Sequence, residues 1–283
     1  MREHCKEHTI ARMAKVLKVS ESGYYKWLKK KESPLTEKEQ DDIRLTEEIF
    51  EIYRASRGAF GYRKVTVILN RRRQSPVNHK RVERIMQECA LFSKASKKYI
   101  CTTDSNHNEE IADNLIERNF FASAPGEKML SDTTVIDTAQ GKLYVAGILD
   151  LYGNMPVGMA MSLNNDRFLV MDAFKDMLSR GRGRPGCIIH SDRGATYCSK
   201  DYRQLIRDNL FICSMSKKGD CWDNAPMESF WGKMKPEWLA SKYRTITEAK
   251  RDVYEYVWHF YPRERPHETF KYMTPVEYYQ RGF

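Results

Sequence analysis

The chain has 283 residues, of which 41% are hydrophobic and 30% charged, so we expect about two globular units and exclude a fibrous or disordered protein. Its apolar runs are shorter than the roughly 18 residues that a membrane span needs, and its charged N-terminus is unlike a signal peptide, which predicts a cytosolic protein. Seven Cys residues without CxxC spacing argue against a disulfide framework and a paired-Cys zinc site.

The net charge of +10 is concentrated near the N-terminus. Residues 1–100 contain 24 Lys and Arg against 13 Asp and Glu, whereas the rest of the chain contains 24 against 25. A basic segment beside a neutral one indicates a surface for a polyanion, most often nucleic acid. The alternative is a basic surface that only favours solubility.

The first third of the chain is predicted to consist of short helices. Apolar residues follow helical spacing over residues 9–17, and Ser20 can cap a second helix that Pro34 ends, which predicts a partial helix-turn-helix over residues 1–32. Further helices are expected over about 39–56, from Gly61 onward, and after a cap at Asn78. Together they predict a second helix-turn-helix region over residues 39–93.

Polar residues of these helices are the candidate DNA contacts. In a helix-turn-helix the first turns of the second helix enter the major groove. An ordinary helical bundle is the alternative, and the charge distribution favours DNA binding. The predicted contacts are Lys26, Arg63, Lys64, Asn78, His79, Lys80, Arg81 and Arg84.

After a polar stretch over residues 94–127, which predicts a linker, the pattern changes to strands. Three short strands with turn signals between them follow from Lys128 and predict an antiparallel meander. Helices are expected over about 167–179, 199–209 and 226–239, with short strands at CIIHSD and over 210–215. This order predicts an α/β fold of ribonuclease-H-like architecture over residues 128–245, a mixed sheet with helices on both faces, followed by a C-terminal helical extension over 246–283.

Three carboxylates converge in this topology. Asp132 lies on the first strand, Asp192 follows the fourth, which neighbours the first, and Glu228 lies on the helix expected over that sheet edge. Grouped carboxylates repel one another and have raised pKa values unless a cation offsets their charge. Such a site suits Mg²⁺ or Mn²⁺, and two such ions would support in-line phosphoryl transfer. Taken singly, each of these residues is more simply a solvated surface group.

Other polar residues near this edge have simpler interpretations. Asp150 ends the second strand, and a capping or supporting role is favoured over metal ligation. Ser214 and Ser216 could be nucleophiles, but the sequence places no His or Lys base beside them, so we interpret them as structural hydroxyls.

Several segments resemble a known family. SDTTVID, YVAGILDLYGN, IIHSDRGATY, SMSKKGDCWDNAPMESFWGKMKPE and RPHETFKYMTPVEYY resemble the catalytic core of bacterial insertion-sequence transposases, specifically the OrfB product of the family named after insertion sequence three. Asp192 and Glu228 have 35 residues between them, a spacing that this family shares with retroviral integrases. GYRKV and VNHKRVERIM resemble its helix-turn-helix region, so the resemblance covers nearly the whole chain.

The resemblance implies a DDE transposase that binds double-stranded DNA, namely the terminal inverted repeats of its element and a target. It implies that Asp132, Asp192 and Glu228 are the catalytic triad and hold two Mg²⁺ or Mn²⁺ ions. It also implies a homo-oligomer on DNA in the bacterial cytoplasm, at the nucleoid, and a fusion to or cooperation with an upstream OrfA segment. Further DNA contacts are predicted from Arg193, Lys217, Lys218, Asn224, Lys235, Arg265 and His267, although the last two could instead only cap the preceding helix.

The chain departs from the family pattern at four positions: Met129, Val135, Asn154 and Pro262. None of them is a member of the triad. Two alternatives to an active transposase remain at this point. One is an end-binding regulator whose core has lost activity. The other is a nuclease on the same fold, which would leave the basic helical region without a task.

Overall fold

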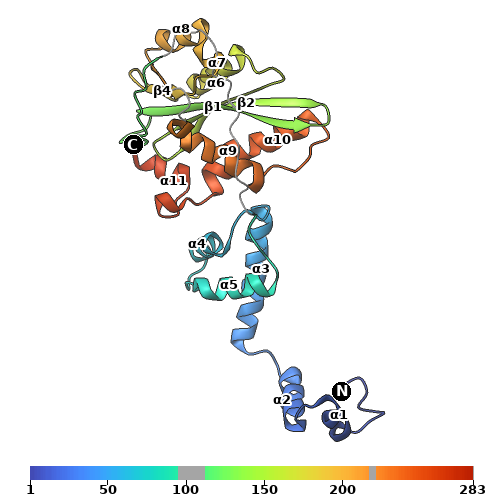
Figure 1. The fold of residues 1–283 in the computed structure, drawn as a ribbon. Coiled ribbons are helices and arrows are strands. Elements are labelled where there is room, and N and C mark those ends of the chain that lie inside the picture. Colours follow the sequence, from blue (N-terminus) through green and yellow to red (C-terminus); the bar gives the residue numbers. More distant parts are fainter. Residues whose placement is uncertain (95–111, 217–220, 283) are drawn as a thin grey trace. The chain divides into compact units, whose positions relative to one another are not determined.

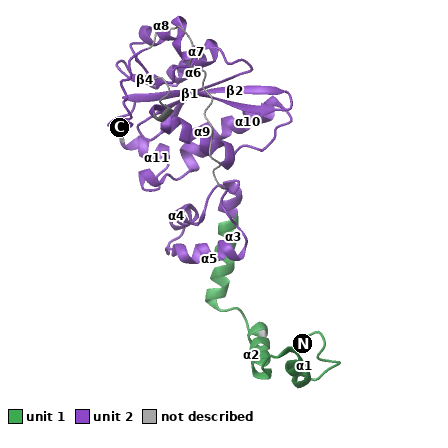
Figure 2. Ribbon diagram, viewed as in Figure 1, with its two compact units in different colours: residues 1–50 green, residues 51–283 purple. Residues whose placement is uncertain are grey.

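The structure is a computed structural model of the chain, and it describes residues 1–94, 112–216 and 221–282. The chain forms two compact units, residues 1–50 and 51–283 (Figure 2). The boundary lies inside helix α3 (Glu37–Ala55), and the helices that follow α3 belong to the same unit as the sheet. No helix of the described residues is long and apolar enough to cross a bilayer.

The first unit contains α1 (Ile10–Leu17), α2 (Glu21–Glu32) and the N-terminal part of α3. The side chains of Thr9 and Ser20 cap α1 and α2 by accepting hydrogen bonds from backbone N–H groups of the first turns. Lys18 ends α1 with a left-handed backbone (φ 53°), which lets the chain turn toward α2. The predicted helices and the Ser20 cap are therefore confirmed.

The second helical region contains α4 (Tyr62–Arg72) and α5 (His79–Glu88). Asn78 caps α5, and the Asn70 side chain bridges the turn between the helices through two hydrogen bonds with the Val77 backbone, at 2.7 and 3.2 Å. One apolar stripe from each helix is buried. The buried residues are Val65, Leu69, Val82, Ile85 and Met86.

The core is built on a five-stranded sheet in the order β3-β2-β1-β4-β5. Its strands are β1 (Lys128–Thr138), β2 (Gly141–Asp150), β3 (Met155–Ser162), β4 (Ile188–Ser191) and β5 (Ile212–Met215). The first three form the predicted antiparallel meander, and β4 and β5 are parallel to β1.

Helices cover both faces of this sheet, as Figure 1 shows. They are α6 (Arg167–Ser179), α7 (Ala195–Cys198), α8 (Lys200–Asp208), α9 (Ala225–Glu237), α10 (Ile246–Glu255) and α11 (Pro275–Tyr279). Helices α6 to α8 lie on one face and enclose the main apolar core, which includes Phe174 and Met177. Helix α9 packs against β1 on the other face. The predicted mixed sheet between two helical layers is confirmed.

The C-terminal extension continues α10 as a π-helical segment over Tyr256–Glu264. Pro262 lies inside it and has no backbone N–H to donate, so it interrupts the regular α-helical ladder. The segment ends where the Arg265 N–H donates to the Phe260 carbonyl at 2.9 Å. This ending turns Arg265 back toward α9, where it forms an ion pair with Glu237.

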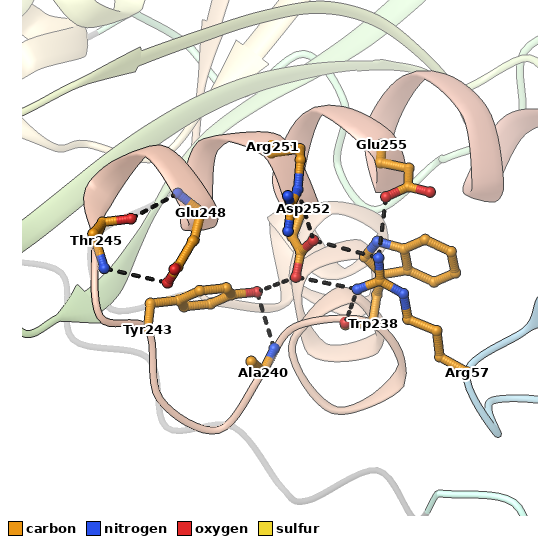
Figure 3. Close-up of polar contacts among 9 residues, drawn as sticks. All are labelled: Arg57, Trp238, Ala240, Tyr243, Thr245, Glu248, Arg251, Asp252 and Glu255. Atoms are coloured by element: carbon orange, nitrogen blue, oxygen red, sulfur yellow. Dashed lines mark hydrogen bonds and ion pairs between the residues drawn. The ribbon is translucent and has the colours of Figure 1, made fainter.

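Arg57, in the loop between α3 and α4, joins the second helical region to the core (Figure 3). Its guanidinium lies 3.1 and 3.3 Å from the two carboxylate oxygens of Asp252 and 3.1 Å from Glu255. It also lies 4.1 Å from the centre of the Trp238 ring. Asp252 is buried and also accepts a hydrogen bond from Tyr243, so its carboxylate is paired with a charge and hydrogen-bonded on both oxygens.

Two more contacts support this joint. The rings of Phe60 and Phe260 stack with their centres 5.4 Å apart. Arg71 of α4 donates to the Tyr272 carbonyl at 2.9 Å and to Glu277 at 3.1 Å. Residues 57 to 71 therefore contact the C-terminal helices through both polar and aromatic groups.

The packing of α9 against the sheet requires a glycine at position 147. A Cβ placed on Gly147 of β2 would lie 2.8 Å from the buried ring of Trp231. We therefore expect Gly147→Ala to lower the free energy of unfolding by about 1–3 kcal/mol, because Trp231 must shift in a packed interior. The measurement is urea unfolding followed by circular dichroism.

Gly232→Ala is the matched control, because the space at Gly232 of α9 is open. Alanine there should raise the stability by about 1 kcal/mol, since glycine disfavours the helix. Equal stability of Gly147→Ala and the wild type would show that Trp231 does not pack tightly on β2.

Candidate active site

Parallel pairing of β1 with β4 places Asp132 and Asp192 side by side. Ser131 is opposite Ser191, the last residue of β4, and the two aspartates are the next residues on each chain segment. The Asp192 carboxylate accepts a hydrogen bond from the Gly194 N–H at 2.9 Å, which stabilises the turn into α7. Both aspartates are half-buried.

Glu228 lies in the first turn of α9, the helix that packs against β1. Burial and then the charge of Asp192 raise the pKa of Asp132 well above its usual range, and the charge of Glu228 adds to this effect. Burial also raises the pKa of Glu228. The structure thus brings the three carboxylates within electrostatic reach of one another.

The donor chemistry of this group fits a hard divalent cation, because it offers only carboxylate oxygens and their repulsion favours added positive charge. The charge of Asp192 affects Asp132 more strongly than that of Glu228 does, so the two aspartates are the tighter pair. Across the described ranges, no three His, Cys, Asp or Glu side chains are gathered closely enough to hold one ion as they stand.

Trp231 borders this group and was not among the site residues predicted from the sequence. It lies three residues after Glu228 and therefore on the same side of α9. Its ring stands over Gly147, which is opposite Asp132 in the pairing of β1 with β2. The indole Nε1 is buried beside the Asp132 carboxylate, and its hydrogen-bonding effect lowers the pKa of that group, against the larger effects of burial and of Asp192. The spacing from Glu228 was the only signal in the sequence.

His190 is a second residue that the sequence analysis missed. Its ring nitrogens lie 2.8 Å from the Ser214 hydroxyl and 3.1 Å from that of Ser216. The expectation that no base lies beside these serines is therefore wrong, because the pairing of β4 with β5 sets His190 opposite Ser214. Burial lowers the pKa of His190 to about 4, so the ring is neutral. All three side chains are buried, and they brace β4 two residues before Asp192.

Asp150 is not a member of the carboxylate group. It pairs with Met129, three residues before Asp132 on β1. Its carboxylate accepts hydrogen bonds from the N–H groups of Gly126 and Tyr152, at 2.7 and 2.9 Å, and from the Tyr279 hydroxyl at 2.9 Å. The structure therefore gives Asp150 the capping role.

Comparison with known proteins matches both parts of the chain. An HTH-like domain model matches residues 39–99, and integrase core domain models match residues 122–221 and 211–275. The chain is 36% identical to the insertion element IS600 uncharacterized 31 kDa protein of Shigella sonnei, over 95% of this chain and 98% of that protein. It is 31% identical to the transposase InsF for insertion sequence IS3A of Escherichia coli strain K12, over 98% of this chain and 96% of that protein.

The chain belongs to the IS3 family of transposases. It is a transposase of an insertion sequence, with a DNA-binding N-terminal region and an integrase core, as the sequence predicted. Among solved structures, the HTLV-2 integrase catalytic core domain in complex with magnesium is 12% identical, with a TM-score of 0.42 over 55% of this chain and 97% of that chain.

The DNA contacts predicted in the helical regions of the transposase lie mostly on its surface. Arg84 forms an ion pair with Glu88 at 3.0 Å, and the Asn78 side chain is engaged in capping α5. As DNA contacts, all of these residues stay predictions. Lys64 and Arg81 are half-buried; the exposed residues are Lys26, Arg63, Asn78, His79, Lys80 and Arg84.

The predicted DNA contacts near the triad differ in exposure. Asn224 is buried directly before α9, and Lys235 is half-buried on that helix. Arg193 donates a hydrogen bond to the Ser216 carbonyl. Lys217 and Lys218 lie outside the described residues.

Arg265 and His267 lie in the interior, 4% and 6% exposed, which corrects their interpretation as direct DNA contacts. Arg265 forms two hydrogen bonds with Glu237, at 2.6 and 2.7 Å. Burial, followed by the charge of Arg265, lowers the pKa of His267 to about 2, so its ring is neutral. Both residues therefore hold the C-terminal extension against α9.

Asp150 should make the free energy of unfolding of the transposase depend on pH. Burial raises its pKa from 3.8 to about 6. The folded state then binds the proton more tightly than the unfolded state, so the contribution of Asp150 to stability falls as the pH rises through this window. In urea unfolding between pH 4 and pH 7, the stability of the wild type minus that of Asp150→Asn should fall by up to about 3 kcal/mol. A constant difference would contradict a raised pKa.

Proposed function

We propose that Asp132, Asp192 and Glu228 form the catalytic centre at which this transposase cleaves DNA at the ends of its element and joins those ends to a target. The observation that carries the proposal is the β1–β4 register, which sets the two aspartates side by side, with the charge of Glu228 acting on Asp132. The membership of the chain in a transposase family supports it.

A divalent cation, Mg²⁺ or Mn²⁺, or a pair of such ions, bound by these carboxylates would supply the positive charge that stabilises the attacking and leaving oxygens of phosphoryl transfer. The chain itself holds the carboxylates in position. Strands β1 and β4 hold the two aspartates, and Glu228, in the first turn of the helix that packs against β1, would complete the site. Trp231 keeps water from the side of Asp132 that faces α9.

The reaction needs no covalent link to the protein. The attacking oxygen comes from water in strand cleavage and from a terminal 3′-hydroxyl in strand transfer. It forms a new bond to phosphorus while the bond from phosphorus to the leaving oxygen breaks. The DNA partners we propose are the terminal inverted repeats and the target, bound by a homo-oligomer of this chain, fused to or acting with an upstream OrfA segment.

Neutral variants of the triad should lose activity while still binding DNA. Asp132→Asn, Asp192→Asn and Glu228→Gln keep the shape of each side chain but remove the charge that holds a cation. We expect cleavage and strand transfer to fall at least about 100-fold, since the cation contributes several kcal/mol to stabilisation of the transition state. The measurement is cleavage and joining of DNA that carries the element's own ends, in Mg²⁺ and in Mn²⁺.

Asp137→Asn is the control, because Asp137 lies on the same strand but is exposed; it should cleave like the wild type. The wild type should also be stabilised against heat by Mn²⁺, and the triad variants much less. Cleavage near the wild-type rate by any triad variant would remove that residue from the centre. A wild-type chain that binds the ends but never cuts them would instead be an end-binding regulator.

A further inference from the structure

A cluster of basic side chains surrounds the ion pair between Arg265 and Glu237. The pair is bidentate, and the two side chains are only 5% and 8% exposed. Lys233 precedes Glu237 by four residues on α9, so the two occupy the same face of that helix. Lys64 comes from α4, where its ammonium lies 5.5 Å from the centre of the Phe60 ring. The charges of Arg265, Glu237 and Lys233 all act on Lys64, so the cluster includes one residue of the second helical region and three of the core.

Positive charge exceeds negative charge in this cluster. Glu237 is already engaged by Arg265, and within the described part of the chain neither Lys64 nor Lys233 forms an ion pair or a hydrogen bond. Burial and then the charge of Arg265 lower the pKa of both lysines, that of Lys64 to about 8. The charge of Glu237, and for Lys64 also that of Glu268, offsets only part of this effect. Partly buried positive charge costs free energy, and a bound anion would relieve the cost that remains.

The form of the cluster suits a phosphate. Lys64 lies in the first turn of α4, and this helix begins at Gly61 without a side-chain cap and has no acidic residue in its first turn. The partial positive charge of a helix N-terminus favours an anion at this end. Both lysines are half-buried, so a surface group can still reach them.

We propose that Lys64 and Lys233 together hold one backbone phosphate of the bound DNA, with Arg265 kept in place behind them by Glu237. The proposal rests on the proposed function, in which DNA is the substrate. Because Lys64 belongs to the helix-turn-helix region and Lys233 to the helix that carries Glu228, this phosphate sets the position of the DNA along both parts at once.

The test is the affinity of the full chain for DNA carrying the element's ends, measured over a range of salt concentrations. Lys64→Gln and Lys233→Gln should each weaken binding by about 10-fold. The slope of log affinity against log salt should fall by about one for the site. The double variant should lose less than the product of the two effects, because both lysines hold the same phosphate. Lys175→Gln, an exposed lysine on α6, is the control and should change neither quantity.

A second measurement locates the phosphate. Neutral methylphosphonates introduced one at a time along the DNA should reveal one position that weakens the wild type but not the double variant. Wild-type affinity and salt slope in both lysine variants would overturn the proposal, whatever their stability. The proposal would also be overturned if inorganic phosphate stabilised the wild type but not the lysine variants while those variants bound DNA normally. That result would indicate a site for free anions.

These results are independent of the catalytic proposal. The affinity measurements require no cleavage, and Asp132→Asn should retain the wild-type affinity and salt slope. If the lysine variants bind DNA more weakly but the wild-type chain never cleaves it, the lysine site is supported and the proposed function is contradicted. If the lysine variants bind DNA with normal affinity and the wild-type chain cleaves it, the proposed function is supported and the lysine site is contradicted.

Discussion

The proposed active site depends on the short parallel pairing of β1 with β4. It places Asp132 and Asp192 at adjacent positions, where each lies in the field of the other and where burial raises the cost of a charge. The neighbouring elements hold this arrangement in place. His190 connects β4 to β5 through two serines, and Trp231 packs over Gly147 beside Asp132. The fold thus maintains an electrostatically unfavourable pair, which is what a cation-binding site requires.

Local patterns in the sequence predicted the local elements well. Short strand segments separated by turn signals identified the meander, and Ser20 and Asn78 marked helix starts that the structure confirms. The order of elements was sufficient to pair Asp132 with Asp192. Contacts that join distant segments could not be read in this way. The ring of Trp231 over Gly147 is one example, and His190 between two serines is another, because each depends on packing or register between elements.

The basic N-terminal segment shows why a charge count overstates a DNA-binding surface. Arg57 and Arg71 add to the positive excess of residues 1–100, yet both form ion pairs with carboxylates of the C-terminal extension. The protein itself therefore neutralises much of their charge; Figure 3 shows the pairs of Arg57, and Arg71 pairs separately with Glu277. The residues that remain as candidates for DNA contacts are exposed ones outside these pairs, such as Lys26, Arg63 and Lys80.

Helix α9 carries residues of both the basic cluster and the carboxylate group. A helix turns by about 100° per residue, so Lys233 points about 140° away from Glu228, and Glu237 lies on the opposite side from it. One side of α9 thus carries Glu228 and Trp231 toward the sheet, while another carries Lys233 and Glu237 toward the basic cluster. Glu228 and Lys233 therefore lie on one helix, which connects the phosphate contact proposed here to the carboxylate group of the sheet.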